Sequence, residues 1–180
     1  MASGLWFAIA SLLSVGAAVA GWRVARARRR RARLRTIGGL HSLTPAAFER
    51  TVGAWFAREG WVVEQRGGAG DQGIDLLAFR GGEVVAVQCK RYGPATAVTP
   101  AQVRELYGAA NGVRATAALL VTTGRLSRAA KQWVATLPPG DLPFQTLSGT
   151  DLESAARGEQ TLMAPPEARI VHRRNARSAH

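Results

Sequence analysis

The sequence predicts an α/β fold in which a mixed β-sheet carries helices on both faces, preceded by one transmembrane helix. Two observations predict it. Over residues 44–163, apolar segments of helical and strand-like pattern follow the order helix, three strands, helix, strand, helix, strand, helix. A hairpin that continues through strand–helix–strand units gives both antiparallel and parallel strand pairs. The first 22 residues, in contrast, contain no charged side chain.

The apolar stretch from Leu5 to Trp22 is long enough for a membrane helix. Its 18 residues hold no charge, and at about 1.5 Å per residue they span roughly 27 Å of a bilayer core about 30 Å thick. Trp6 and Trp22 lie near its ends, where tryptophan favours the membrane interface. A cleaved signal peptide is the alternative, because "AVA" at 18–20 resembles a cleavage site. No basic residue precedes the apolar run, which favours the anchor.

The positive charge of the chain, formally +12, lies outside its central part. Residues 23–35 hold eight arginines and no acid, whereas residues 36–168 hold 12 basic and 12 acidic side chains. Because basic residues stay on the cytoplasmic side, we expect the N-terminus outside a bacterial-type inner membrane and the rest of the chain in the cytoplasm. Residues 23–43 are then a juxtamembrane linker whose arginines contact anionic lipids. Residues 164–180 are expected to form a disordered basic tail.

A helix with clear ends opens the predicted domain at "TPAAFERTVGAWFAREG". Thr44 suits the N-cap, Pro45 the first helical position, and Gly60 the stop after the last turn. The apolar residues that recur at spacings of three and four are Phe48, Val52, Trp55 and Phe56. Glu49 lies beside this stripe, so its carboxylate is expected at the edge of the buried face.

Three strand-like segments follow this helix. "WVVEQ" is a short strand that leads into a glycine-rich turn. Residues 74–80 and 83–91 are two apolar runs separated only by Gly81 and Gly82. Two glycines between strands are typical of a two-residue hairpin turn, since both central residues take positive φ.

The remaining segments alternate helices with strands. Thr99 and Gln102 form a capping box at the start of a second long helix, and "ATAALLVTTG" is a buried strand. Ser127 is placed to cap a third helix. A last short strand in "DLPFQTL" precedes a terminal helix, for which Thr150 and Glu153 predict another capping box.

The predicted hairpin gathers three polar side chains from two apolar strands. If Arg80 faces Glu83 across the glycine turn, Asp75 lies directly opposite Gln88, with their Cβ atoms about 5 Å apart. Lys90 follows Gln88 by two residues and projects from the same face. A carboxylate, an amide and an ammonium group then share a patch roughly 7 Å across.

Such a patch suits metal-dependent phosphodiester hydrolysis. Asp75, the amide oxygen of Gln88 and the main-chain carbonyl of Cys89 are hard oxygen ligands for Mg²⁺ or Mn²⁺. Lys90 could then orient the attacking water or neutralise charge in the transition state. The alternative is a hairpin whose polar residues only face solvent, and the residues alone leave both interpretations open. The side chain of Cys89, the only cysteine, points away from the Gln88 face.

The segments "GDQGIDLLA" and "VAVQCKRY" resemble the Mrr-type restriction endonuclease domain of the PD-(D/E)xK superfamily. The resemblance covers about residues 44–155 and includes "FERTVGAWFAREGWVVE", "VRELYGA", "LLVTTGRLSRAA" and "LSGTDL". It implies a restriction-endonuclease-like fold with Asp75, Gln88 and Lys90 as catalytic residues and Glu49 as an acidic helix residue near them.

The resemblance also implies a function, a Mg²⁺-dependent DNA endonuclease that acts on foreign or modified DNA. Together with the apolar N-terminal stretch, this predicts a membrane-anchored endonuclease. Gln72, Arg91 and Tyr92 are expected to contact DNA, an ordinary strand exit being the alternative for the last two. Gln88 stands where most of the superfamily has an acid, so the site has one negative charge fewer. A catalytically inactive module that tethers DNA to the membrane therefore remains the alternative, and a protein-binding membrane protein is a third. The oligomeric state is open, a homodimer included.

Overall fold

The computed structural model describes residues 2–66, 73–138 and 141–164. In this part of the chain the helices are α1 (Ala2–Arg33), α2 (Ile37–His41), α3 (Pro45–Arg58), α4 (Pro100–Gly112), α5 (Arg128–Ala135) and α6 (Gly149–Arg157). The strands are β1 (Val62–Gln65), β2 (Leu76–Arg80), β3 (Glu83–Lys90), β4 (Ala97–Val98), β5 (Ala117–Thr122), β6 (Arg125–Leu126) and β7 (Phe144–Leu147). Most of the predicted basic tail, residues 165–180, lies outside the described residues.

Five strands form one mixed sheet in the order β1-β2-β3-β5-β7. Strand β2 pairs antiparallel with β1 and β3, whereas β3, β5 and β7 pair parallel to one another. Strands β4 and β6 form a separate two-stranded parallel pair. The parallel pairs require helical crossovers, which α4 and α5 supply in the chain order. The predicted mixed sheet is confirmed.

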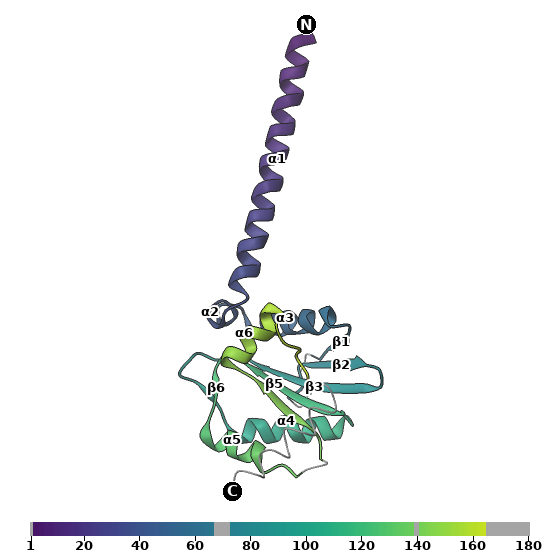
Figure 1. The fold of residues 1–180 in the computed structure, drawn as a ribbon, viewed down its shortest axis with the longest axis vertical. Helices are drawn as coiled ribbons and strands as arrows, with labels where there is room; N and C mark the ends of the chain where they lie inside the picture. Colours follow the sequence, from purple (N-terminus) through teal and green to yellow (C-terminus); the bar gives the residue numbers. More distant parts are fainter. Residues whose placement is uncertain (1, 67–72, 139–140, 165–180) are drawn as a thin grey trace.

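Helices cover both faces of this sheet (Figure 1), as the sequence predicts. On one face α3 and α6 pack against alternate residues of the strands, together with Leu40 of α2. On the other face α4 and α5 cover the residues in between. The first cluster includes Phe48, Val52, Phe56, Leu76, Val87, Leu119 and Leu152. The second includes Leu77, Ala86, Val103, Leu106, Leu120 and Ala130. All six residues of β5 are buried, because helices lie on both sides of it.

The glycine turn sets the register of the β2–β3 hairpin. Gly81 and Gly82 both have positive φ, +54° and +84°, which a two-residue turn of this hand requires. Arg80 pairs with Glu83 immediately outside the turn, and the same register continues to the pair of Leu76 with Val87. The register predicted from the sequence is therefore confirmed over the whole of β2.

Three predicted helix starts are confirmed by their hydrogen bonds. The Thr44 hydroxyl accepts the N–H of Ala47 at the start of α3. At α4 the Thr99 hydroxyl accepts the N–H of Gln102, whose side chain accepts the N–H of Thr99 in return. Satisfying these main-chain groups stabilises a helix end by about 1 kcal/mol. Ser127 caps α5 in the same way, and Gly60 follows α3 with a positive φ of +83°.

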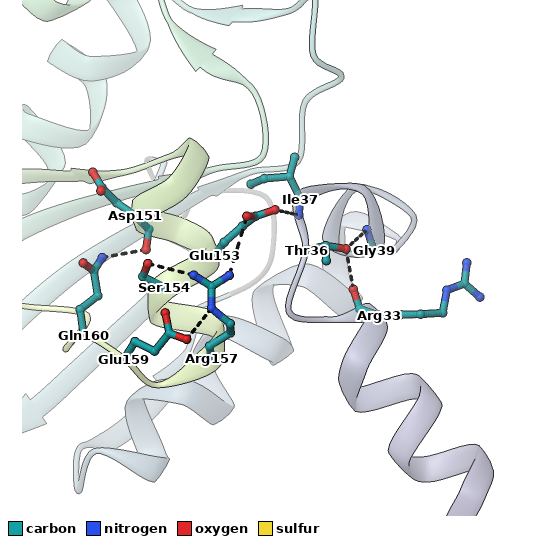
Figure 2. A network of polar contacts seen from close by, with 10 residues as sticks. All are labelled: Arg33, Thr36, Ile37, Gly39, Asp151, Glu153, Ser154, Arg157, Glu159 and Gln160. Carbon is teal, nitrogen blue, oxygen red and sulfur yellow. Dashed lines mark hydrogen bonds and ion pairs between the residues drawn. The ribbon is translucent and has the colours of Figure 1, made fainter.

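The predicted capping box of the last helix is wrong. Helix α6 begins two residues earlier than expected, with Ser148 in the N-cap position. Glu153 instead accepts the main-chain N–H of Ile37 at 2.8 Å, so its carboxylate serves the first turn of α2 (Figure 2). Arg157 lies beside the same carboxylate at 3.8 Å. A contact between residues distant in the sequence has thus replaced the local one.

The segment before the domain differs from the expected linker. Helix α1 continues past Trp22 through the arginine-rich residues to Arg33. The chain then turns into α2, where Thr36 caps the helix by accepting the N–H of Gly39 (Figure 2). Leu40 is fully buried in the first core cluster. Within the described part of the chain, no helix has the length and apolar character needed to cross a bilayer.

The turn gives a first testable prediction. Replacing Gly82 by Ala should lower the free energy of unfolding by about 1–2 kcal/mol, because a Cβ disfavours positive φ. Replacing Gly81 by Asn should leave it nearly unchanged, because Asn-Gly suits this turn and a Cβ at position 81 has no neighbour within 4 Å. Urea unfolding of the two variants measures the difference. Equal losses of stability would contradict the turn geometry.

Candidate active site

Asp75 lies at the end of the hairpin, where the regular ladder stops. Its main-chain N–H donates to the carbonyl of Val87 at 2.9 Å, although Val87 is the register partner of Leu76. An offset of one residue is the mark of a β-bulge, which re-aims a side chain. The carboxylate reaches the main chain of β3, where Oδ2 accepts the N–H of Cys89 at 2.6 Å. Asp75 is therefore fixed beside the Gln88–Cys89 peptide, and the simple cross-strand pair expected from the sequence is modified by the bulge.

Gln88 is the most deeply buried polar residue of the predicted site. Its side chain is 1% exposed. Among the described residues, its amide oxygen Oε1 has no hydrogen-bond partner. Alternation along β3 places it on the α4 face, with Ala86, whereas Val87 and Cys89 belong to the α3 face. A buried amide oxygen without a partner costs about 1–3 kcal/mol, so this oxygen is available for a ligand.

The thiol of Cys89 lies among three of the other predicted catalytic residues. Burial raises the pKa of this thiol well above its usual range. The negative charges of Asp75 and Glu49 raise it further, and the positive charge of Lys90 opposes them. Charges act on a group in this way only at short range. Glu49 on α3, Asp75 before β2 and Lys90 at the end of β3 are thus each near enough for their charge to act on the Cys89 thiol, which is buried as expected.

The end of β3 is held firmly by the neighbouring strand. Lys90 pairs with Thr122 of β5, and its main-chain carbonyl accepts the Thr122 hydroxyl at 2.7 Å. The same carbonyl lies 3.0 Å from the N–H of Tyr92 and 3.3 Å from that of Thr123. The main chain of Lys90 is thus fixed, while its side chain stays half-buried at the border of the site.

The three residues expected to contact DNA have different outcomes. Arg91 donates from Nη1 to the main-chain carbonyl of His41 at 2.9 Å, which links the exit of β3 to α2. The Tyr92 hydroxyl accepts the side-chain amide of Gln102, which links the same loop to α4. Both side chains therefore serve the packing of this loop. Gln72 lies outside the described residues.

Glu105 is a residue near the site that the sequence did not predict. A Cβ placed on Gly73 would lie 2.9 Å from Nε2 of Gln88 and 3.2 Å from Cδ of Glu105. The side chains of Gln88 and Glu105 thus approach each other around this glycine. The sequence carried no signal for it, because Glu105 is one exposed acid on the polar side of α4. Only the packing of α4 against β3 brings it here.

The oxygen atoms present fit a divalent cation that prefers hard ligands. Within residues 2–66, 73–138 and 141–164, no three His, Cys, Asp or Glu side chains cluster closely enough to hold a metal by themselves. Oε1 of Gln88, which has no partner among the described residues, supplies a further ligand, an amide oxygen on the residue next in the chain to the N–H that the Asp75 carboxylate accepts. A cation here would be held by one acid and one amide, with Glu105 close to the Gln88 side chain on the α4 face and Glu49 contributed by α3, which covers the opposite face of the sheet.

Comparison with known proteins concerns the fold and the family. Two solved structures resemble the fold: the DNA modification-dependent restriction endonuclease AspBHI and the MspJI restriction endonuclease in complex with a 27-mer oligonucleotide. The first has a TM-score of 0.54 and 19% identity, over 83% of this chain and 40% of its own. The second has a TM-score of 0.47 and 23% identity, over 72% of this chain and 32% of its own. This chain thus spans less than half the length of either.

A search of curated proteins gives no match. Residues 40–154, well over half of the chain, match the restriction endonuclease family Mrr_cat. The match begins at the buried Leu40 and ends within α6, so it includes both helical layers and all strands of the sheet. It also contains Glu49, Asp75, Gln88 and Lys90. The chain therefore belongs to the Mrr_cat family of restriction endonucleases and carries a nuclease domain.

Proposed function

We propose that this nuclease domain hydrolyses DNA with a divalent cation, Mg²⁺ or Mn²⁺, held by Asp75 and Gln88. The observation that carries the proposal is the amide oxygen of Gln88, which belongs to a side chain only 1% exposed and has no hydrogen-bond partner among the described residues. A cation would offset the cost of burying this oxygen. The Asp75 carboxylate, which accepts the N–H of Cys89, the residue after Gln88, is the proposed charged ligand.

The residues around the proposed cation site have different roles in phosphodiester hydrolysis. Asp75 and Gln88 would hold the cation, which would supply a more acidic water molecule and a polarised phosphate when bound. The hydrogen bond from Cys89 fixes the orientation of the Asp75 carboxylate, so little reorganisation accompanies binding. Lys90 places an ammonium group at the border of the site, where it neutralises negative charge that develops on the phosphate. Glu49 adds negative charge from α3, and the Cys89 main-chain carbonyl is a third candidate oxygen ligand.

DNA is the substrate that the family and the fold favour. The excess basic side chains that could contact its phosphates lie outside the central part of the chain, since residues 36–168 are neutral overall. Arg91 and Tyr92 contribute by fixing the loop after β3, and Gln72 lies in the glycine-rich segment before Asp75. The structural relative AspBHI is a DNA modification-dependent restriction endonuclease, so foreign or modified DNA is the proposed target. A homodimer would provide two sites for double-strand cleavage.

We further propose that the N-terminal segment holds the domain at the cytoplasmic side of a bacterial-type inner membrane. This proposal rests on the sequence: 18 uncharged residues from Leu5 to Trp22, followed directly by eight arginines. The arginines would contact anionic lipid head groups.

Cleavage of supercoiled plasmid tests the proposed chemistry. The full-length chain should cut with Mg²⁺ or Mn²⁺ and stop on addition of EDTA. Asp75→Ala and Lys90→Ala should each lower the rate by about 10²–10³-fold, because each removes a group that stabilises charge in the transition state. Asp151→Asn on α6 is the matched control, since it removes one acid from the surface of the opposite face and should cut normally.

The outcomes separate the nuclease from the alternative. Equal cutting by all four proteins would eliminate the mechanism. DNA binding without cutting, at any divalent cation concentration, would favour the module that only tethers DNA, which the neutral Gln88 motivates. Methylated and unmethylated plasmids assayed side by side determine whether modification is sensed.

Cell fractionation tests the location. The full-length chain should sediment with membranes and resist extraction with high salt, because apolar burial is insensitive to salt. A variant without residues 2–22 should become extractable, since only charge would then hold it. Finding the full-length chain in the supernatant at low salt would contradict the membrane proposal and leave the nuclease proposal untouched.

A further inference from the structure

We propose that Glu105 of α4 provides the second carboxylate of the metal site, in place of the acid that Gln88 does not supply. This inference rests on the proposed function and extends it to a residue on another element. Mg²⁺ and Mn²⁺ are bound most tightly where carboxylates surround them. Asp75 and Gln88 alone give the site one negative charge.

The geometry around Gly73 brings Glu105 to Gln88. A Cβ on this glycine would meet Nε2 of Gln88 at 2.9 Å and both Cδ and Cγ of Glu105 at 3.2 Å. The two side chains therefore lie no farther apart than the sum of those distances. Gly73 also has a φ of +83°, which disfavours any other residue. It stands two residues before Asp75, so the chain that leads into Asp75 passes close to both side chains.

The position of Glu105 is fixed by the packing of α4. The capping box at Thr99 fixes the start of the helix, and Val103 and Leu106, on either side of Glu105, are fully buried in the second core cluster. The side chain of Gln102, one turn earlier, bonds the Tyr92 hydroxyl just beyond β3. Helix α4 is thus tied to the same end of the sheet that carries Gln88. The main chain at Glu105 cannot move away without breaking these contacts.

Within residues 2–66, 73–138 and 141–164, no contact gives Glu105 a structural task. Among the described residues its carboxylate makes no hydrogen bond or ion pair. It lies beyond the first turn of α4, so it does not serve as a cap or complement the helix dipole. The atom of Gln88 that lies toward Glu105 around Gly73 is Nε2, and the amide oxygen of the same side chain is buried and has no partner within the described chain. A cation bound to the amide oxygen of Gln88 would therefore have an exposed acid on the neighbouring side chain, Glu105, to complete its ligands.

Mn²⁺ binding to the full-length chain, measured by calorimetry, tests this inference with a readout independent of cutting. Glu105→Gln should weaken binding about tenfold or more, because it removes a negative charge at the cation without changing the shape of the side chain. Asp151→Asn, which removes one exposed acid from α6 on the opposite face, should bind as the wild type does. Glu105→Asp keeps the charge and should bind more tightly than Glu105→Gln.

The decisive variant restores the acid at the other position. Gln88→Glu combined with Glu105→Gln should recover most of the lost affinity, whereas a purely structural effect of Glu105→Gln would not be rescued. Thermal melting of each variant verifies that the fold is retained. Unchanged affinity in Glu105→Gln, or failure of the rescue, would overturn the role of Glu105 while wild-type cutting still supported the nuclease. A wild-type protein that neither bound Mn²⁺ nor cut plasmid would overturn both proposals.

Discussion

The site depends on a strand, β3, that is hydrogen-bonded on both sides. It pairs antiparallel with β2 and parallel with β5, so it joins the hairpin half of the sheet to the parallel half. If the register of β3 shifted by one residue, Gln88 would face the α3 layer and Cys89 the α4 layer. Every apolar side chain of β3 would then also leave the core cluster that it now packs in. The consecutive residues 88–90 therefore keep one orientation. The surrounding loops and helices pack against this strand, whose position is fixed by β2 and β5.

The parts of the structure that follow from local chemistry could be predicted from the sequence. Two glycines with positive φ determine the register of the hairpin. Thr99 and Gln102 bond the free main-chain N–H groups at the start of the helix to which they belong. The parts that depend on distant partners could not. The bulge at Asp75 arises where the carboxylate competes with the main chain for the N–H of Cys89. Glu153 was expected to cap its own helix, yet it binds Ile37, more than 100 positions away.

The same distinction applies to the candidate site. Asp75, Gln88 and Lys90 stand out because polar residues interrupt apolar strands, a pattern visible without any structure. The sequence does not indicate Glu105, because one acid among the exposed residues of a helix forms no pattern. Gln88 also shows why an amide is tolerated where a carboxylate is common. Burying a neutral amide costs a few kcal/mol, whereas an ionised carboxylate at the same depth is stable only when a positive charge accompanies it. The strand can therefore fold before any cation arrives.

The junction between α1 and the domain has a consequence for how far the enzyme can search. Helix α1 has 32 residues, a length of about 48 Å, and α2 at its end is fixed by Leu40 in the core and by Glu153. Such an arm behaves as a stiff spacer, unlike a flexible leash, which would let the domain sample a sphere of positions. If residues 5–22 are held in a membrane, the remaining turns of α1, residues 23–33, would set the distance of the domain from its surface, so that DNA would have to come to the enzyme.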